Sequence, residues 1–476
     1  MNDYSDFDFK SLPNSRLVTK DLIPTRKEDR HLSSFDMFWL WVGMSVLLTT
    51  FTVGANLYPS LSIATILLSV GIGNAIVVVI LAFTGDIGVT YGIPFPVYLR
   101  ACYGYLGTNI PAIIRSLPAM FWLGFQSFLG ATAINSILVI VTGGGWSGSF
   151  NGMLAILVIF IGIQVVTTAR GVNAIAWFEK LVSPVMVLMG LYILYWIMSE
   201  NNITLLDIIQ TPAGDVPSGQ MQYTFGYAVT SATGYWATMS LNILDFTRYY
   251  KAPETTSWYK RNKGLIWSQA IGVVTTMVFF AFIGAAAMVA TGLWNPVDVI
   301  TSMNAPTALT IIALIVAALA QWSTNIGANI LPPANIFVNA FAPKVNFAGG
   351  CIIAGIIAFA MQTWKYGNFL ITIFAYISGA LGAIAGTMIV DYYILRGRKL
   401  NVVDLYKFDG QYRYCKNYNP AAFIAYLVGF GTALLWLDWA FLVSGILGGV
   451  VYFLLMRYWG AKKYGQLEIM ERFNIK

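Results

Sequence analysis

The chain has 476 residues, of which 57% are hydrophobic and 10% are charged, and its formal net charge is +7. About a quarter of the residues of an ordinary soluble domain are charged, so this composition excludes that class. Apolar runs long enough to cross a bilayer recur throughout, which predicts an all-α polytopic membrane protein. The three cysteines are scattered and the single histidine is His31, so neither a disulfide framework nor a histidine metal centre is expected.

Twelve transmembrane helices are predicted from the apolar runs. In chain order they cover residues 35–58, 60–84, 106–139, 151–169, 177–198, 222–246, 265–291, 306–338, 346–364, 367–395, 421–436 and 438–457. The third, sixth, eighth and tenth spans are long enough to tilt or to break. The segment before the first span lacks the features of a signal peptide, so we expect none to be cleaved.

Basic residues are distributed unevenly about these spans. Of the 28 lysines and arginines, 27 fall in the tails, the alternate connections and the span ends on one side, and only Lys365 falls on the other. The positive-inside rule then predicts a protein of the cytoplasmic membrane with both termini in the cytoplasm. The positive charge faces anionic lipid of the bilayer, and no nucleic-acid partner is implied.

Polar residues interrupt the third and eighth spans. Trp122 and Gln126 are four residues apart, so they share one helix face, where they suit a flat, polar, uncharged ring. In the eighth span Ser323 and Thr324 offer neutral oxygens suited to a hard monovalent cation, with Asn329 further along the helix. The alternatives are that Gln126 bonds a neighbouring helix, and that the hydroxyls bond carbonyls of their own helix.

Glycines indicate interruptions in the first and sixth spans. Gly43 and Gly54 precede Pro59 in the first span, and Gly226 and Gly234 flank threonine and serine residues in the sixth. Broken helices at corresponding positions of two halves are typical of the binding site in inverted-repeat transporters. Close helix packing is the alternative explanation for each glycine.

Five stretches carry a resemblance to a known family. They are YGIPFPVYLRACYG (91–104), FWLGFQSFLGA (121–131), LNILDFTR (241–248), QWSTNIGANILPPA (321–334) and DYYILRGRKLNVVDLY (391–406). The chain resembles the nucleobase–cation symporter-1 family of hydantoin, allantoin, cytosine and uracil permeases, and within it most resembles the bacterial sodium-coupled hydantoin permeases.

This resemblance implies a LeuT-type fold of two inverted five-helix repeats followed by two C-terminal helices. The corresponding parts are a cytoplasmic N-terminal tail (1–34), the first repeat (35–198), an extracellular loop (199–221), the second, inverted repeat (222–395), a cytoplasmic loop (396–420), the two C-terminal helices (421–457) and a cytoplasmic tail (458–476).

The resemblance also implies a substrate site between the first, third, sixth and eighth spans. Trp122 and Trp236 would hold the ring, Gln126 and Asn329 would bond its amide edges, and Tyr235 would lie beside it. Leu47 stands where the hydantoin permeases have a glutamine, and Tyr235 where they have a glycine, so the substrate cannot be transferred from them. Phe374 lies near the position of the family's outer gate.

A cation site is implied in the same way. The matched groups are the backbone carbonyls of Gly43, Val46 and Ala320 and the hydroxyls of Ser323 and Thr324. A proton-coupled carrier usually needs a carboxylate or histidine within the membrane. We find only Asp245 and Asp391, near the cytoplasmic ends of their spans, so Na⁺ is favoured as the coupling ion, with H⁺ as the runner-up.

We therefore expect a secondary active importer of a small neutral nitrogen heterocycle, such as a nucleobase, allantoin or a hydantoin. It would work by cation symport with alternating access, as a monomer and without a cofactor. An amino-acid or other small polar solute transporter of the same fold is the alternative. The spans offer no catalytic pair and no cofactor motif, so an enzyme is not expected, and a channel would need repeated rings of polar residues.

Overall fold

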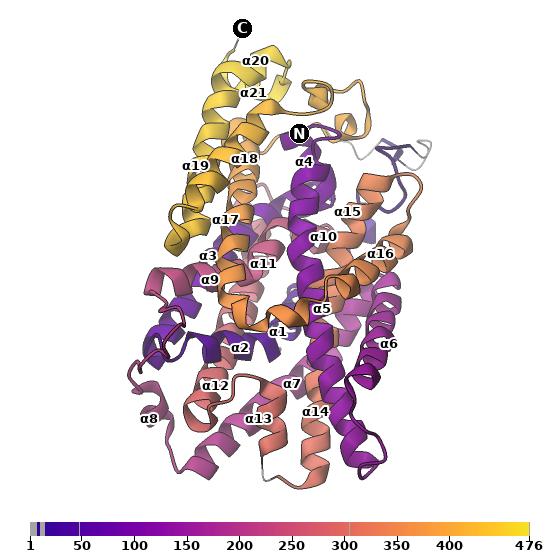
Figure 1. Cartoon of the computed structure of the whole chain (residues 1–476). Helices are drawn as coiled ribbons and strands as arrows, with labels where there is room; N and C mark the ends of the chain where they lie inside the picture. Colours follow the sequence, from indigo (N-terminus) through magenta and orange to yellow (C-terminus); the bar gives the residue numbers. More distant parts are fainter. Residues whose placement is uncertain (1–6, 10–14, 47, 304, 476) are drawn as a thin grey trace.

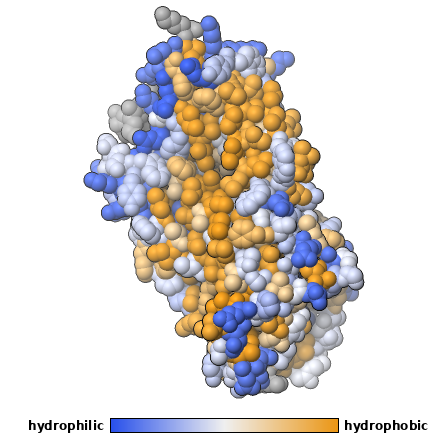
Figure 2. Space-filling model, turned by 90° about the vertical axis from the view of Figure 1, so that its left-hand side faces the viewer, coloured by the Kyte–Doolittle hydropathy of each residue, from blue (hydrophilic) through white to orange (hydrophobic). Residues whose placement is uncertain are grey.

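The computed structural model describes residues 7–9, 15–46, 48–303 and 305–475, and over these residues the fold is built from helices, with no named strand. Among these described residues, eight helices are long and apolar enough to cross a membrane, and the count is nine if the bent pair α1–α2 forms one span. Both chain ends lie at one end of an elongated bundle, and α8 and α13 lie at the other (Figure 1). On the face shown in Figure 2, hydrophobic side chains form a broad band between more hydrophilic ends.

Each of the twelve predicted spans overlaps a helix or a run of helices. In chain order these are α1 (Ser34–Ser45) with α2 (Leu48–Leu57), α3 (Ile63–Tyr91), α5 (Asn109–Val141), α6 (Phe150–Ala169), α7 (Val172–Asn201), α9 (Phe225–Asn242) with α10 (Leu244–Thr247), α11 (Trp258–Gln269) with η3 (Ala270–Thr275) and α12 (Thr276–Thr291), α14 (Thr307–Thr324) with η4 (Asn325–Ile330) and α15 (Leu331–Phe341), α16 (Phe347–Ala360), α17 (Leu370–Ile389) with η6 (Val390–Leu395), α18 (Pro420–Ala433) and α19 (Ala440–Leu455). Shorter helices outside the spans are α4 (Phe95–Tyr103), α8 (Leu205–Ile209), α13 (Pro296–Ser302), α20 (Ala461–Lys463) and α21 (Leu467–Phe473).

The helices of the two predicted repeats pack against one another both within each repeat and between the repeats. Helix α9 contacts α3 and α17, α5 contacts α14, α2 contacts α12, and α1 contacts α7. Helices α18 and α19 pack on each other and on α17, at the edge of the bundle (Figure 1). The helices that carry the predicted site residues therefore meet in the interior of the bundle.

The first span is interrupted, as predicted. Helix α1 ends at Ser45, helix α2 begins at Leu48, and the two are bent by 55°. Val46 has a non-helical ψ of 87°, and the carbonyls that precede it lose their helical partners. Two threonine hydroxyls replace these partners, since Thr324 donates to the Met44 carbonyl and Thr50 to the Ser45 carbonyl, both at 2.9 Å.

The interruption predicted between Gly226 and Gly234 in the sixth span is wrong. Helix α9 is continuous through both glycines, and a single turn residue, Ile243, separates it from α10. A Cβ atom at Gly234 would overlap the Phe374 carbonyl oxygen, so this glycine serves the close approach of α17. Close helix packing, the alternative explanation, accounts for it.

The eighth span widens into the π-helix η4 just before two prolines. Pro332 has no N–H group, so the Ala328 carbonyl four residues earlier loses its usual donor. The buried guanidinium of Arg115 donates to this carbonyl at 3.4 Å and to the Thr238 carbonyl at 3.2 Å. Arg115 thus joins α5 to both α9 and the widened turn.

The packing at Gly234 predicts a loss of stability in Gly234→Ala. The added methyl group must push α9 away from α17, and overpacking of this kind costs about 1–3 kcal/mol. We expect a lower unfolding temperature of the purified protein in detergent. Gly162→Ala, in α6 with no atom within 4 Å of the added methyl, is the matched control and should not lower it. An equal effect of the two substitutions would contradict the packing argument.

The distribution of basic residues predicts which face a membrane-impermeant reagent can reach. In a Cys415→Ser background, which removes the one exposed cysteine of the described residues, a cysteine at Lys263 should be protected from an impermeant thiol reagent in intact cells. A cysteine at Gln210, an exposed residue on the other side, should react. The reverse labelling pattern would show that the orientation is inverted.

Candidate functional site

The predicted cation residues lie where the broken first span meets the eighth. Gly43, Val46, Ala320, Ser323 and Thr324 are all buried, and α1 contacts both α14 and η4. The Thr324 hydroxyl donates to the Met44 carbonyl and lies 3.3 Å from the Ala320 carbonyl. The structure therefore gathers carbonyl and hydroxyl oxygens from two spans at one point, the ligand chemistry that a hard monovalent cation prefers.

A carboxyl group that we did not predict lies at the same point. Glu179 on α7 has a fully buried side chain, and the Ser323 hydroxyl donates to its Oε2 atom. The expectation that the spans hold no carboxylate besides Asp245 and Asp391 is therefore wrong. The predicted fifth span began at residue 177, which placed Glu179 at its edge, whereas α7 begins at Val172 and places it two turns inside the helix.

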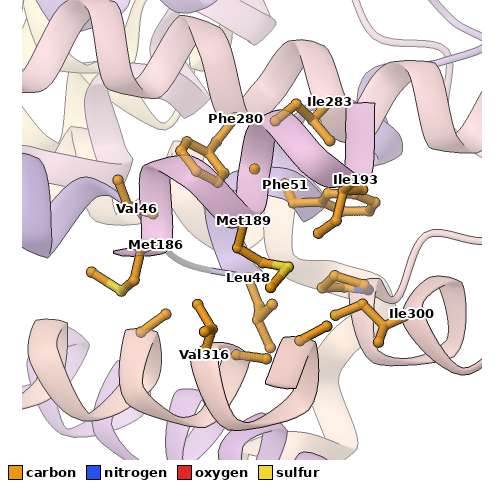
Figure 3. A pocket seen from close by; sticks show the side chains of 15 residues that line it. Val46, Leu48, Phe51, Met186, Met189, Ile193, Phe280, Ile283, Ile300 and Val316 are labelled. Carbon is orange, nitrogen blue, oxygen red and sulfur yellow. The ribbon is translucent and has the colours of Figure 1, made fainter. Parts of the chain in front are cut away.

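An apolar cavity adjoins this cluster. It is lined by side chains from α2, α7, α12, α13 and α14, among them Phe51, Met186 and Phe280, together with Val46 and Ala320 (Figure 3). Its free space of about 40 Å³ is enough for about one water molecule, and no charged residue lines it. Its chemistry does not suit a polar heterocycle.

The predicted aromatic residues form one cluster, which contacts the start of α2 through Tyr235 and Thr49. The ring of Trp122 lies 4.8 Å from Phe374 and 4.9 Å from Tyr235, and Tyr235 lies 5.6 Å from Phe374. Trp236 contacts Tyr235 and packs edge-on against Trp41, with each centroid distance 5.5 Å. The structure thus brings Trp122, Tyr235 and Phe374 together, while Trp236 joins the cluster through Tyr235.

The two predicted amides are hydrogen-bonded to each other. Asn329 Nδ2 donates to Gln126 Oε1 at 3.3 Å and to Asn325 Oδ1 at 2.8 Å. Gln126 Nε2 donates to the Thr49 hydroxyl at 3.5 Å, and that hydroxyl lies 2.5 Å from the Tyr235 hydroxyl. One polar network therefore joins α2, α5, α9 and η4 beside the aromatic cluster.

Sequence reasoning gave no role to Thr49, Ser127 and Gln164, and it noted Asn325 only as a member of the polar cluster in the eighth span. Thr49 was unmarked because a threonine in an apolar helix usually bonds its own backbone. Asn325 donates to Gln164 on α6 at 2.8 Å, a contact between residues 161 positions apart. The signal that could have found these residues is their polarity within an apolar run. Leu47, the departure expected in the first span, lies outside the described residues.

A broken helix that faces polar side chains inside a bundle is typical of a membrane transporter of the inverted-repeat class. Residues 24–459 of the chain match the family described as "Permease for cytosine/purines, uracil, thiamine, allantoin". The chain belongs to this permease family, so the family resemblance and the expectation of a transporter, as opposed to an enzyme, are confirmed.

Similar curated proteins cover almost the whole chain. A hydantoin permease of Microbacterium maritypicum is 30% identical over 453 residues, which are 94% of this chain and 90% of that protein. An allantoin permease of Bacillus subtilis is 31% identical over 471 residues, 93% of this chain and 94% of that protein. A purine-uracil permease of Arabidopsis thaliana is 29% identical and covers 94% of this chain and 79% of its own length.

A solved structure supports the fold. The nucleobase-cation-symport-1 family transporter Mhp1, in a closed conformation with bromovinylhydantoin bound, matches with a TM-score of 0.87 and 30% identity over 94% of this chain and 97% of that chain. A Na⁺-coupled sialic acid symporter at 15% identity matches with a TM-score of 0.60 over 95% of this chain and 93% of that chain, and supports the fold alone. The predicted all-α fold of the LeuT type is confirmed.

Proposed function

We propose that the protein imports a small, neutral nitrogen heterocycle together with a cation. The observation that carries this proposal is the pairing of an aromatic cluster with two carboxamides beside the broken first span. Aromatic faces stack on a planar ring, and amides complement its N–H and C=O edges, as they do in base recognition. Similar proteins are named as permeases for hydantoin, allantoin and purine-uracil, all of which are nitrogen heterocycles, and this supports the proposed substrate class.

The aromatic residues would contact the face of the substrate ring, and the amides would bond its edges. Trp122 and Trp236 would face the ring, with Tyr235 beside them, and Gln126 and Asn329 would exchange their mutual hydrogen bond for bonds to the substrate. That exchange leaves no buried amide unpaired in either state, which keeps the cost of an empty site low. Phe374, which packs on Trp122, would act as a gate that covers the ring.

Na⁺ is the coupling ion that the oxygen cluster suits, and its preference over H⁺ now rests on that cluster alone. Glu179 is a carboxyl group inside a span, which H⁺ coupling could use, so H⁺ stays the runner-up. The carbonyls of Gly43, Val46 and Ala320 and the hydroxyls of Ser323 and Thr324 would surround it at the break between α1 and α2. A cation held there would fix the first span against the eighth and so raise substrate affinity, and substrate would raise cation affinity equally. Alternating access would then expose the site to each side in turn, with both termini in the cytoplasm and one chain sufficient as a monomer.

An amino-acid transporter of the same fold is the second candidate. It would need a positive group or a free helix N-terminus for the substrate carboxylate. The break supplies one such N-terminus, at the start of α2 beside Thr49, but no positive side chain among the described residues belongs to the network. The side chains that hold the network around Trp122 are amides, hydroxyls and aromatic rings, which suit the faces and edges of an uncharged ring better than a carboxylate.

The substrate class is tested by direct binding to the purified protein. Allantoin, a hydantoin, uracil, cytosine and leucine should be compared in NaCl and in choline chloride at constant pH. We expect binding of at least one heterocycle and none of leucine, with affinity that falls when sodium is removed. Binding of leucine alone would establish the amino-acid alternative, and uptake that ignores sodium but collapses with a protonophore would assign the coupling to H⁺.

The roles of the amides predict weaker substrate binding in Gln126→Leu and Asn329→Leu. Each change removes hydrogen bonds to the ring, worth about 1–3 kcal/mol, so the Kd should rise about 5- to 150-fold. Asn135→Leu is the matched control, since Asn135 is an amide on α5, the helix of Gln126, and its side chain accepts a hydrogen bond from Trp146, outside the network. Equal loss of folded protein with unchanged Kd in the protein that remains would show that both amides serve only helix packing.

A further inference from the structure

Glu179 is a buried carboxyl group without a charge partner among the described residues. Its side chain is fully buried, and its Oε1 atom has no hydrogen-bond partner there. The neighbouring Lys180 does not neutralise it, because Lys180 pairs with Asp36 at the start of α1. A buried carboxylate is costly unless a cation or several donors compensate it.

The Glu179 carboxyl lies against two of the residues proposed to hold the cation. Its Oε2 atom accepts the hydroxyl proton of Ser323 on α14. The same atom occupies the space where a Cβ atom of Gly43 would lie, so the carboxyl group reaches the backbone of α1 just before the break. It therefore contacts both spans between which the cation would bind.

The hydrogen bond to Ser323 has a consequence for the cation. A serine hydroxyl has one proton and two lone pairs, so a hydroxyl that donates to Glu179 keeps its lone pairs for another partner. A carboxylate that accepts from a ligand group also fixes its orientation and increases its basicity, as outer partners of metal ligands do. Two other residues proposed to hold the cation, Val46 and Ala320, border the apolar cavity, and no charged residue lines that cavity (Figure 3).

We propose that Glu179 supplies the negative charge of the cation site and positions the Ser323 hydroxyl toward the ion. The inference rests on the proposed cation symport, and it adds an anionic group to a set of five neutral oxygens. The cation in turn compensates the buried carboxylate. The site would thus bind Na⁺ through charge as well as through oxygen geometry.

The test measures sodium binding apart from transport. Unfolding temperatures of the purified protein are recorded without heterocycle as NaCl replaces choline chloride at constant ionic strength. We expect saturable stabilisation of the wild type by sodium, and in Glu179→Gln a half-saturating concentration about 10- to 100-fold higher. Glu200→Gln, at the exposed end of the same helix, is the matched control and should leave that concentration unchanged. Glu179→Asp keeps the charge on a shorter side chain, so it should raise the half-saturating sodium concentration less than Glu179→Gln does. It also replaces Glu179→Gln in the test if that variant fails to fold.

The outcomes separate this inference from the proposed function. If sodium stabilises the wild type, and Ser323→Ala weakens that effect while both Glu179 variants leave it unchanged, the role of Glu179 is refuted and the sodium site stands. If sodium does not stabilise the wild type at all, the proposed sodium coupling fails and the inference fails with it. A purely structural role would lower the unfolding temperature without moving the sodium concentration of half-saturation.

Discussion

The break between α1 and α2 leaves backbone carbonyls without helical partners in the middle of a bundle, where water cannot replace them at low cost. The surrounding helices are arranged to satisfy these groups. Thr324 reaches the Met44 carbonyl from α14, and Thr50 turns back to the Ser45 carbonyl. Because the break binds α14 to α1 through these oxygens, a cation placed there would act on the contact between the two repeats.

The amide network beside the break joins helices through side chains that are also the proposed binding groups. Gln126 and Asn329 bond each other and thereby connect α5 to η4. The same groups face the aromatic cluster around Trp122, where a ring with polar edges could take over their hydrogen bonds. The structure shows the helix contact, and the proposed ligand contact would replace one hydrogen bond of the same network.

Close helix approach and widened helix turns place these groups. Gly234 lets the backbone of α17 come against α9, which brings Phe374 to Trp122 and Tyr235. The π-helix η4 compensates for the prolines that follow it and turns Asn325 and Asn329 toward the interior. The site consequently depends on backbone geometry at a few positions and on the side chains around them.

Composition and pattern alone established the class of protein, the position of its spans and a charge asymmetry that predicts its orientation. The spans are a local property, because each apolar run is recognised from its own residues. The orientation is an additive property, because it follows from the numbers of lysines and arginines on the two sides of the membrane. The motifs around Trp122 and Ser323 also marked segments whose helices pack against each other, because polar residues within apolar runs stand out.

Only the tertiary structure decided how the marked residues meet. Gly234 lies within a continuous helix and admits the close approach of α17, a contact that the pattern within α9 does not reveal. Glu179 and Ser323 are 144 positions apart, and Asn325 and Gln164 are 161 apart, so their contacts exist only when the helices are packed. A buried carboxyl at the end of a predicted span looks like an ordinary surface charge until the start of the helix and its neighbours are known. Such long-range contacts arise from the arrangement of helices in space, and for that reason local sequence patterns do not reveal them.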